Sequence, residues 1–238
     1  MAQYDSFARF YDAVNGEPEE LVTRILDYVH RYAPNATSIL ELGCGTGAVL
    51  SGLGSGFTLT GIDLSPSMLA RARRRCREAR LVLGDITSFS LDETFDVVIC
   101  VFDTLNHVTS LEGWRAVFAR VASHLSPGGL FVFDVITVGR LRDLDESAAW
   151  VYDFDGNTLI MSVDFADEPL ARWNIRVFEG TGGDVFELHH EIISELGVAL
   201  DDVRALLAGD FEILDSGDVE GGPASDNSER ALFAVRRR

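Results

Sequence analysis

The spacing of apolar residues divides the chain into two parts with different patterns. From residue 4 to about residue 136, helical faces alternate with short and nearly continuous apolar runs. Such runs are typical of parallel strands buried on both faces, whereas a spacing of three to four residues indicates helices packed on a sheet. The pattern predicts strands at 38–42, 58–62, 81–83, 95–102 and 130–135, and helices at 4–14, 17–32, 65–79 and 109–125, with a short helix after residue 47.

The pattern changes after about residue 148. Short apolar runs occupy residues 149–194 and are separated by turn-forming residues such as Gly156-Asn157. Short strands with turn signals between them indicate an antiparallel sheet. A last helix at 201–207 and two strands, at 211–215 and 230–235, complete the chain.

Strands that alternate with helices predict an α/β fold, in which a mostly parallel sheet carries helices on both faces. The chain has 238 residues, so one domain with an elaboration fits better than two independent domains. We expect residues 1–148 and 195–238 to form this domain. Residues 149–194 are expected to form an antiparallel insertion that covers the substrate pocket as a lid.

The charge balance excludes several kinds of function. The chain has 38 acidic and 20 basic residues, a net charge of −18, and every basic residue is arginine. Without lysine there is no Schiff-base lysine and no P-loop lysine, and the Tyr-x-x-x-Lys pair of short-chain dehydrogenases is also absent. The negative charge disfavours binding to nucleic acids and to anionic membranes.

The cysteines and the termini indicate the compartment. Cys44, Cys76 and Cys100 contain no C-x-x-C pair, which argues against a disulfide framework or a zinc site. The N-terminus lacks the features of a signal peptide, and no apolar run approaches the roughly 18 residues of a membrane span. The adjacent His189 and His190 point to opposite faces of a strand, so no metal is expected. We expect a cytoplasmic monomer or homodimer.

A glycine-rich turn supplies the clearest chemical signal. Gly43, Gly45 and Gly47 lie between a predicted strand and a predicted helix, where glycines let the backbone approach a ligand closely. Asp63 ends the next strand, where a carboxylate can accept both hydroxyls of a ribose. Asp85 follows the third strand and could bind an adenine amino group. Since the carboxyl ends of neighbouring strands meet at one edge, these residues predict an adenosine-bearing ligand.

The glycines alone do not identify that ligand. Gly43-x-Gly45-x-x-Ala48 also satisfies the looser dinucleotide pattern, so an NAD-dependent oxidoreductase is an alternative. Glu41 distinguishes the two, because a carboxylate here suits a cationic ligand and would sit badly beside a pyrophosphate. S-adenosylmethionine carries a sulfonium and an ammonium group, whereas NAD offers neither at this position.

Several segments with the right order and spacing carry a family resemblance. They are Ile39–Gly47, Gly61–Leu69, Gly84–Ile86, Phe95–Val98 and Leu125–Gly129. Together they resemble the successive motifs of class I S-adenosylmethionine-dependent methyltransferases over residues 38–135. The resemblance implies a Rossmann-like seven-stranded sheet of order 3-2-1-4-5-7-6, with the antiparallel insertion before the last helix. The opening residues and this insertion resemble a small-molecule subgroup that includes amino-sugar N-methyltransferases.

The resemblance also implies roles at the cofactor site. Asp63 would bind the ribose, Met68 or Leu64 would pack on the adenine, and Tyr11 would reach the methionyl carboxylate. Asp85 and Ile86 would hold the adenine edge, while Val101 or Phe102 would offer a carbonyl to the ammonium. Plainer roles remain open, since Met68 could be core, Asp85 a turn residue and Tyr11 a packing residue. The complete set is Tyr11, Glu41, Gly43, Cys44, Gly45, Asp63, Leu64, Met68, Asp85, Ile86, Val101 and Phe102.

The methyl acceptor is expected to meet the loop after the fourth strand. Asp103, Asn106 and His107 are candidates for holding or deprotonating it, together with Tyr11, and His107 could act as a base. The predicted activity is methyl transfer to a nitrogen or oxygen atom of a small molecule. An amino-sugar nucleotide N-methyltransferase is the most concrete alternative. A non-catalytic module that binds S-adenosylmethionine is another, which would show binding without turnover.

Overall fold

The computed structural model describes residues 4, 7–183, 185–219 and 221–238. Its main sheet consists of strands β1 (Ser38–Leu42), β2 (Thr58–Asp63), β3 (Arg80–Leu83), β4 (Phe95–Cys100), β5 (Leu125–Ile136), β10 (Phe211–Asp218) and β11 (Arg230–Arg237). Their order is β3-β2-β1-β4-β5-β11-β10, with β11 antiparallel to both of its neighbours. When the strands are counted along the sheet alone, this is the predicted order 3-2-1-4-5-7-6. The predicted α/β fold is confirmed.

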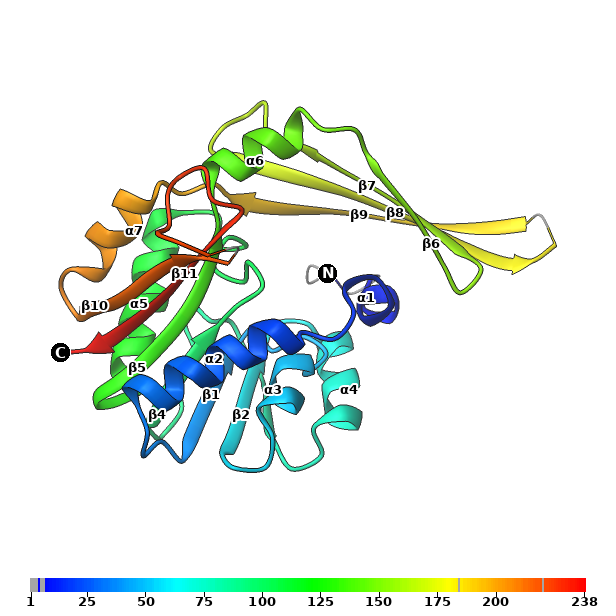
Figure 1. Cartoon of the computed structure of the whole chain (residues 1–238). Coiled ribbons are helices and arrows are strands. Elements are labelled where there is room, and N and C mark those ends of the chain that lie inside the picture. Colours follow the sequence, from blue (N-terminus) through cyan, green and yellow to red (C-terminus); the bar gives the residue numbers. More distant parts are fainter. Residues whose placement is uncertain (1–3, 5–6, 184, 220) are drawn as a thin grey trace.

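The described helices are α1 (Ala8–Asn15), α2 (Glu19–Tyr32), α3 (Ala48–Leu53), α4 (Pro66–Arg75), α5 (Leu111–His124), α6 (Val138–Asp145) and α7 (Leu200–Leu207). Helices α2, α3, α4, α5 and α7 cover the two faces of this sheet, whereas α1 and α6 lie beside the insertion (Figure 1). The apolar stripe of α2, including Ile25 and Val29, packs with the β4 residues Val97 and Ile99 on one face. On the opposite face, Trp114 and Phe118 of α5 and residues of α7 pack on β4 and β5. Residues of β4 are buried on both faces, as its continuous apolar run predicts.

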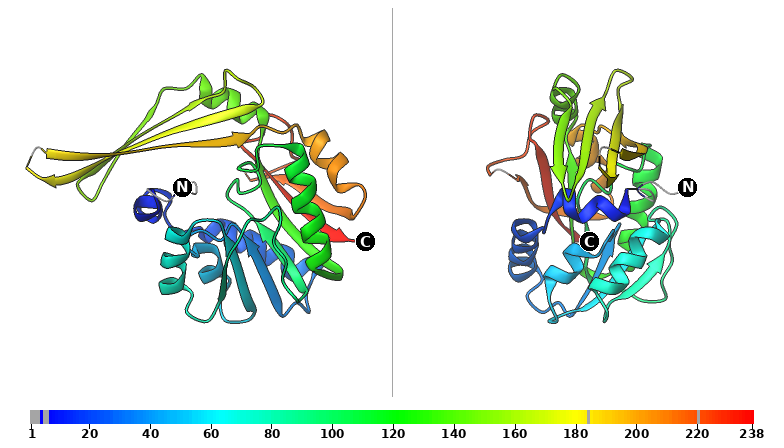
Figure 2. Two further views of the ribbon diagram at one scale, coloured as in Figure 1. Left: turned by 180° about the vertical axis from the view of Figure 1, so that it is seen from behind. Right: turned by 90° about the vertical axis from the view of Figure 1, so that its right-hand side faces the viewer.

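The insertion forms a separate antiparallel sheet. Its strands are β6 (Trp150–Phe154), β7 (Asn157–Asp164), β8 (Leu170–Gly182) and β9 (Val185–Leu196), in sequence order. Figure 2 shows this sheet extending away from the main sheet, with α1 between the two. The apolar face of α1 is buried in it, because Phe7 and Phe10 pack against Ile175, Val177 and Ile193.

Several predicted boundaries differ from the structure. The first helix begins at Ala8 rather than residue 4, and residues 5 and 6 lie outside the described part of the chain. The helix predicted over 65–79 ends at Arg75, where Cys76 adopts a non-helical conformation. The pattern did not predict α6, which begins where the Thr137 side chain accepts a hydrogen bond from the Arg140 amide. Helix α6 is short, and its apolar and charged residues alternate, so the apolar spacing is only a weak indication of a helix.

Candidate functional site

A cavity of about 740 Å³ opens at the carboxyl ends of β1, β2 and β4. This volume lies in the usual range for small-molecule sites. Each predicted cofactor residue lines the cavity, and so does His107 on the acceptor side. Those residues are Tyr11, Glu41, Gly43, Cys44, Gly45, Asp63, Leu64, Met68, Asp85, Ile86, Val101, Phe102 and His107.

The glycine-rich turn is held by Asp63. One carboxylate oxygen of Asp63 accepts a hydrogen bond from the Gly45 amide at 2.8 Å, and the other accepts one from the Ser65 amide at 2.8 Å. Gly45 has a φ of +52° and no atom within 4 Å of the place where a Cβ would lie. Gly43 has a φ of +68°, and a Cβ there would clash with the Thr104 side chain at 2.3 Å. The turn therefore needs glycine at both positions.

Glu41 is a buried carboxylic acid in the cavity wall. Its side chain is at the carboxyl end of β1, and its Oε2 atom has no hydrogen-bond partner among the residues described. Burial and the neighbouring Asp63 raise its pKa well above the usual value for glutamate. An unpaired buried carboxylate is costly, so this atom suits a cationic group brought by a ligand.

The residues predicted to hold an adenine lie on one side of the cavity. Met68 is buried, whereas Leu64 is mostly exposed. The Oδ1 atom of Asp85 accepts hydrogen bonds from both the amide and the hydroxyl of Thr87, at 2.8 and 2.7 Å. Asp85 therefore stabilises the turn that its position suggested, and it also lines the cavity.

The loop after β4 is fixed by Asp134 of β5. Phe102 and Asp103 both have left-handed backbones, with φ values of 59° and 58°. Their amides donate to the two carboxylate oxygens of the fully buried Asp134, each at 3.0 Å. Arg230 of β11 bridges this loop to the strand, since it pairs with Asp103 at 2.6 Å and with Asp134 at 3.1 Å. The strained loop thus has a defined shape beside the cavity.

Asp103 and Asn106, two of the predicted acceptor residues, are absent from the residues that line the cavity. The carboxylate of Asp103 is held by Arg230. Asn106 is fully buried, and its side-chain amide donates to the carbonyls of Ile136 and Leu196 while its oxygen accepts from the Ile136 amide. In the structure, Asn106 joins β5 to β9, and its polar atoms are occupied by the backbone.

His107 faces the cavity in a neutral form. Burial lowers its pKa from 6.5 to about 4, and a backbone contact with Ser194 opposes that shift. Its Nε2 atom lies 3.2 Å from the Tyr4 hydroxyl, and its Nδ1 atom lies 3.8 Å from Glu195 of β9. Tyr4 and Tyr11 meet edge to face and both line the cavity. Burial raises the pKa of each phenol, so both remain protonated at neutral pH.

Helix α1 connects the insertion to the glycine-rich turn. Asp12 of α1 accepts a hydrogen bond from the Thr46 hydroxyl at 2.6 Å. At the other side, Glu191 of β9 accepts hydrogen bonds from the Tyr4 and Phe7 amides. Tyr11 is placed over the cavity between these two attachments.

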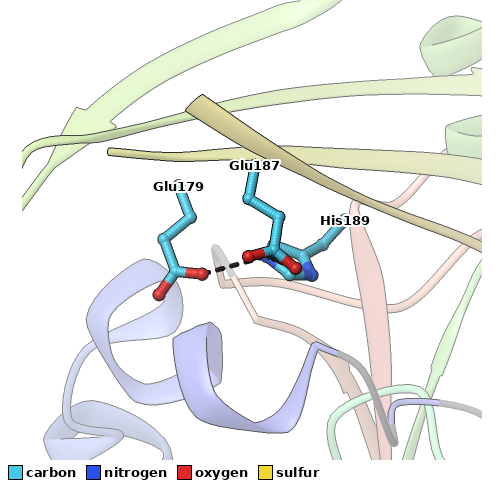
Figure 3. A group of neighbouring side chains, drawn as sticks. All are labelled: Glu179, Glu187 and His189. Carbon is cyan, nitrogen blue, oxygen red and sulfur yellow. Dashed lines mark hydrogen bonds and ion pairs between the residues drawn. The ribbon is translucent and has the colours of Figure 1, made fainter. Parts of the chain in front are cut away.

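A group of possible metal ligands lies on the outer side of α1. Figure 3 shows Glu179, Glu187 and His189 of β8 and β9 with their ligand atoms directed toward one another, all within 4.8 Å. The guanidinium of Arg9, however, lies 2.6 Å from Glu179 Oε2 and 2.7 Å from His189 Nε2. A cation of the chain itself therefore occupies this group, which serves to attach α1 to the insertion.

Sequence reasoning missed the residues that support the site from a distance. Glu195 and Arg230 lie on strands that come after the motif-bearing part of the chain, and Asp134 lies on β5 beyond the motif Leu125–Gly129. A single charged residue within an apolar strand is a usable signal, since burial of a charge requires a partner. Asp134 in Phe131–Ile136 shows that signal, but its partners cannot be identified from the sequence alone.

Comparisons with known proteins agree with this geometry. A family profile described as "Methyltransferase domain" matches residues 39–129. The dTDP-3-amino-3,6-dideoxy-alpha-D-glucopyranose N,N-dimethyltransferase of Streptomyces fradiae is 37% identical over 132 residues, which cover 53% of this chain and 52% of that protein. The dTDP-3-amino-3,4,6-trideoxy-alpha-D-glucopyranose N,N-dimethyltransferase of Streptomyces venezuelae is 37% identical over 111 residues, covering 46% and 47%. The chain thus spans about half the length of these curated relatives.

Two solved structures share the fold over nearly the whole chain. An S-adenosylmethionine-dependent methyltransferase from Clostridium acetobutylicum has a TM-score of 0.87 at 24% identity, with 98% of each chain covered. An amino pentose methyltransferase from Micromonospora echinaspora, with bound S-adenosylmethionine, has a TM-score of 0.81 at 24% identity, with 100% and 99% covered. At this level of identity, the similarity concerns the fold.

Proposed function

We propose that this chain is a class I S-adenosylmethionine-dependent methyltransferase that transfers a methyl group to a nitrogen or oxygen atom of a small molecule. The methyltransferase profile over residues 39–129 agrees with the family predicted from the motifs of residues 38–135, and the solved structures share the predicted fold. The observation that supports the activity most directly is the buried Oε2 atom of Glu41, which has no partner among the described residues, beside the turn that Asp63 holds.

The residues of the cavity fit S-adenosylmethionine chemically. Glu41 offers an anion to its cationic methionyl end, and Asp63 offers carboxylate oxygens to its ribose hydroxyls. Asp85, Ile86 and Met68 offer a polar edge and an apolar face to its adenine. When bound, S-adenosylmethionine supplies a methyl group on a positively charged sulfur, which keeps the bonding electrons as the acceptor forms the new bond.

The chain's own contribution on the acceptor side is alignment and removal of a proton. The Tyr4 hydroxyl and His107 line the same cavity as the cofactor residues, and both are buried in their neutral forms. Neutral side chains beside the acceptor do not protonate its nucleophilic atom, so its lone pair stays free to attack. A fixed position of the acceptor lowers the entropic cost of the reaction. Asp103 and Asn106 act by shaping the loop that presents His107.

An amino-sugar nucleotide is the most concrete acceptor. Its support is the identity of the Streptomyces fradiae and Streptomyces venezuelae relatives, which are named as N,N-dimethyltransferases of dTDP-amino sugars. The excess of 18 negative charges disfavours nucleic acid as the acceptor.

The insertion, β6–β9, is proposed as the lid over the acceptor. It provides Glu191 and Glu195 near Tyr4 and His107, and α1 packs on its apolar face. None of the described helices is both long enough and apolar enough to cross a membrane. The three cysteines are free and buried, which suits a reducing compartment, and we place the reaction in the cytoplasm of the cell with a monomer or homodimer as the active form.

Calorimetric titration with S-adenosylmethionine, S-adenosylhomocysteine and NAD tests the proposed site. We expect micromolar binding of both adenosyl ligands and no binding of NAD. Transfer of a labelled methyl group to a panel of amino sugars and simple amines or alcohols then tests the activity. Binding without transfer to any acceptor would favour a non-catalytic module, and binding of NAD alone would overturn the assignment of Glu41.

A further inference from the structure

Three polar side chains from three different parts of the chain form a row beside the cavity. Tyr4 precedes α1, His107 lies in the loop after β4, and Glu195 belongs to β9 of the insertion. The Tyr4 hydroxyl lies 3.2 Å from His107 Nε2, and Glu195 Oε1 lies 3.8 Å from His107 Nδ1. Tyr4 and His107 line the cavity, whereas Glu195 is absent from its lining residues and lies on the far side of the imidazole.

The inner end of this row is buried and incompletely paired. The side chain of Glu195 is 4% exposed and that of His107 is 19% exposed. Among the described residues, the Trp173 indole lies beside the Glu195 carboxylate and the Ser194 backbone lies beside His107, and each contact shifts the pKa of the group it meets. Neither contact meets the full geometry of a hydrogen bond, so Glu195 Oε2 and His107 Nδ1 can each take a better-aligned partner.

We propose that Glu195 is the positioning residue of His107, accepting the Nδ1 proton so that the Nε2 lone pair faces the Tyr4 hydroxyl. This inference rests on the proposed methyltransferase function, for which Tyr4 and His107 form the acceptor side. The distance of 3.8 Å exceeds a hydrogen bond, and catalytic hydrogen bonds often shorten only when the ligands are bound. The backbones of the loop and of β9 are already fixed to each other, because Leu196 and Asn106 exchange two hydrogen bonds, so a side-chain rotation of Glu195 is enough to bring its carboxylate onto Nδ1.

The row accounts for the proton that the acceptor loses. The acceptor gives its proton to the Tyr4 oxygen, the Tyr4 hydroxyl gives its own proton to His107 Nε2, and the imidazole becomes an imidazolium. Tyr4 gains one proton and loses one, His107 gains one, and Glu195 accepts the Nδ1 hydrogen bond without taking its proton. No oxidant or further reactant takes part.

The charged surroundings make this row sensitive to pH. Asp103 of the loop, Asp134 of β5 and Arg230 of β11 face Glu195, while Tyr11 and Glu191 are close to Tyr4. Burial, and then the charge of Asp103, raises the pKa of Glu195 well above its usual value. Below that pKa, Glu195 is protonated and would donate to Nδ1, which reverses the imidazole tautomer. Turnover should therefore fall as the pH drops through the raised pKa of Glu195.

Nitrogen NMR of the imidazoles tests the proposal without an acceptor, using full-length protein saturated with S-adenosylhomocysteine. The signal of His107 is identified by its loss in His107→Asn. We expect the Nδ1–H tautomer at pH 8 in the wild type and in Glu195→Gln, whose carbonyl can still accept the proton. We expect the other tautomer in Glu195→Leu. The same tautomer in all three proteins would overturn the proposal.

Turnover measurements provide the second test. In the wild type, kcat should show an acidic limb, which Glu195→Gln should remove while keeping kcat within a few-fold. Glu195→Leu should lower kcat on the order of tenfold to a hundredfold. In the His107→Asn background, Glu195→Leu should add no further loss, since residues that act as a unit are not additive. Additive losses would show a merely structural role for Glu195.

The controls separate this proposal from the proposed function. Glu212→Gln changes an exposed carboxylate on β10 and should leave tautomer and turnover unchanged. If wild-type protein binds no S-adenosylhomocysteine, the proposed function fails, whatever the state of His107. If it binds the ligand and Glu195→Leu retains the wild-type tautomer, only the role of Glu195 fails.

Discussion

The carboxylate of Asp63 accepts the amide proton of Gly45 at 2.8 Å, across 18 positions of the chain. This hydrogen bond joins the end of β2 to the middle of the glycine-rich turn. The second oxygen of Asp63 holds the Ser65 amide at the start of α4. One side chain therefore shapes the turn and presents acceptor atoms to the cavity, so that its removal should disturb both functions at once.

Asp63→Ala should weaken the binding of S-adenosylhomocysteine by about tenfold to a hundredfold or more. Hydrogen bonds to a charged group contribute about 1.5–3 kcal/mol each, and about 1.4 kcal/mol corresponds to a factor of ten. Calorimetry measures the change in Kd directly. Asp92→Ala, which removes an exposed carboxylate, is the matched control. An unchanged Kd in Asp63→Ala would refute the ribose contact.

Glu41→Gln should have opposite effects on ligand binding and on the stability of the ligand-free protein. The neutral amide cannot offset the charge of the sulfonium or ammonium, so binding of S-adenosylmethionine should weaken. The folded-state pKa of Glu41 is raised, which means that folding favours the protonated acid. The associated stability is fully present below the ordinary pKa of glutamate and is lost as the pH rises through the raised value.

Unfolding in urea at several pH values checks the second effect. Relative to the wild type, Glu41→Gln should be equally stable near pH 4 and more stable near pH 8. Glu78→Gln, an exposed position on the segment after α4, should show no such pH-dependent difference. A Gln variant that is less stable at pH 8 would contradict the assignment of Glu41 as a buried carboxylate whose charge is not neutralised in the ligand-free protein.

Asp134→Asn should destabilise the protein by about 3–5 kcal/mol, since it removes one partner of a buried ion pair. The substitution also replaces one carboxylate oxygen, which accepts a hydrogen bond, with an NH2 group, which donates. The two oxygens of Asp134 accept hydrogen bonds from the amides of Phe102 and Asp103. We therefore expect a lower unfolding midpoint in urea and a raised KM for S-adenosylmethionine. Asp210→Asn, which is exposed after α7, should change neither quantity. A normal KM in Asp134→Asn would show that the loop keeps its shape without this carboxylate.

The sequence allowed the residues that line the cavity at the ends of β1 and β2 to be predicted because their signals are local. Gly43, Gly45 and Asp63 lie at the ends of consecutive strands, and parallel strands bring such ends together whatever their exact boundaries. The acceptor side depends on contacts between distant parts of the chain. Arg230 meets Asp103 across 127 positions, and such a contact has no periodicity or spacing that could reveal it.

Asn106 shows the limit of a prediction made from loop position alone. Its place after β4 led to the prediction that it holds the acceptor, but Asn106 does not line the cavity. Its amide is directed between β5 and β9, where it donates to the carbonyls of Ile136 and Leu196. The direction of the Asn106 side chain depends on where the insertion lies relative to the main sheet. The pattern of residues 149–194 predicts the strands of the insertion but not that position.

Phe10→Ala tests whether α1 joins the insertion to the cofactor site. Phe10 is 5% exposed and packs on Phe154 and His189. Removing a buried phenylalanine costs about 3–5 kcal/mol, and here the loss should be confined to the interface between α1 and the insertion. Hydrogen exchange should therefore speed up in α1, β8 and β9, while the amides of β1 and β4 keep their protection.

Arg9→Ala is the matched control for Phe10→Ala, because it removes the surface contacts of Arg9 with Glu179, His189 and the Phe10 ring and leaves the buried aromatic packing of α1 in place. Surface ion pairs such as that of Arg9 with Glu179 contribute about 0.2–1 kcal/mol, so exchange should change little. Phe10→Ala should also weaken binding of S-adenosylhomocysteine, since displacement of α1 removes Tyr11 from the cavity and Asp12 from Thr46. A uniform rise in exchange across both sheets would instead mean that α1 stabilises the whole fold and that the insertion does not open separately.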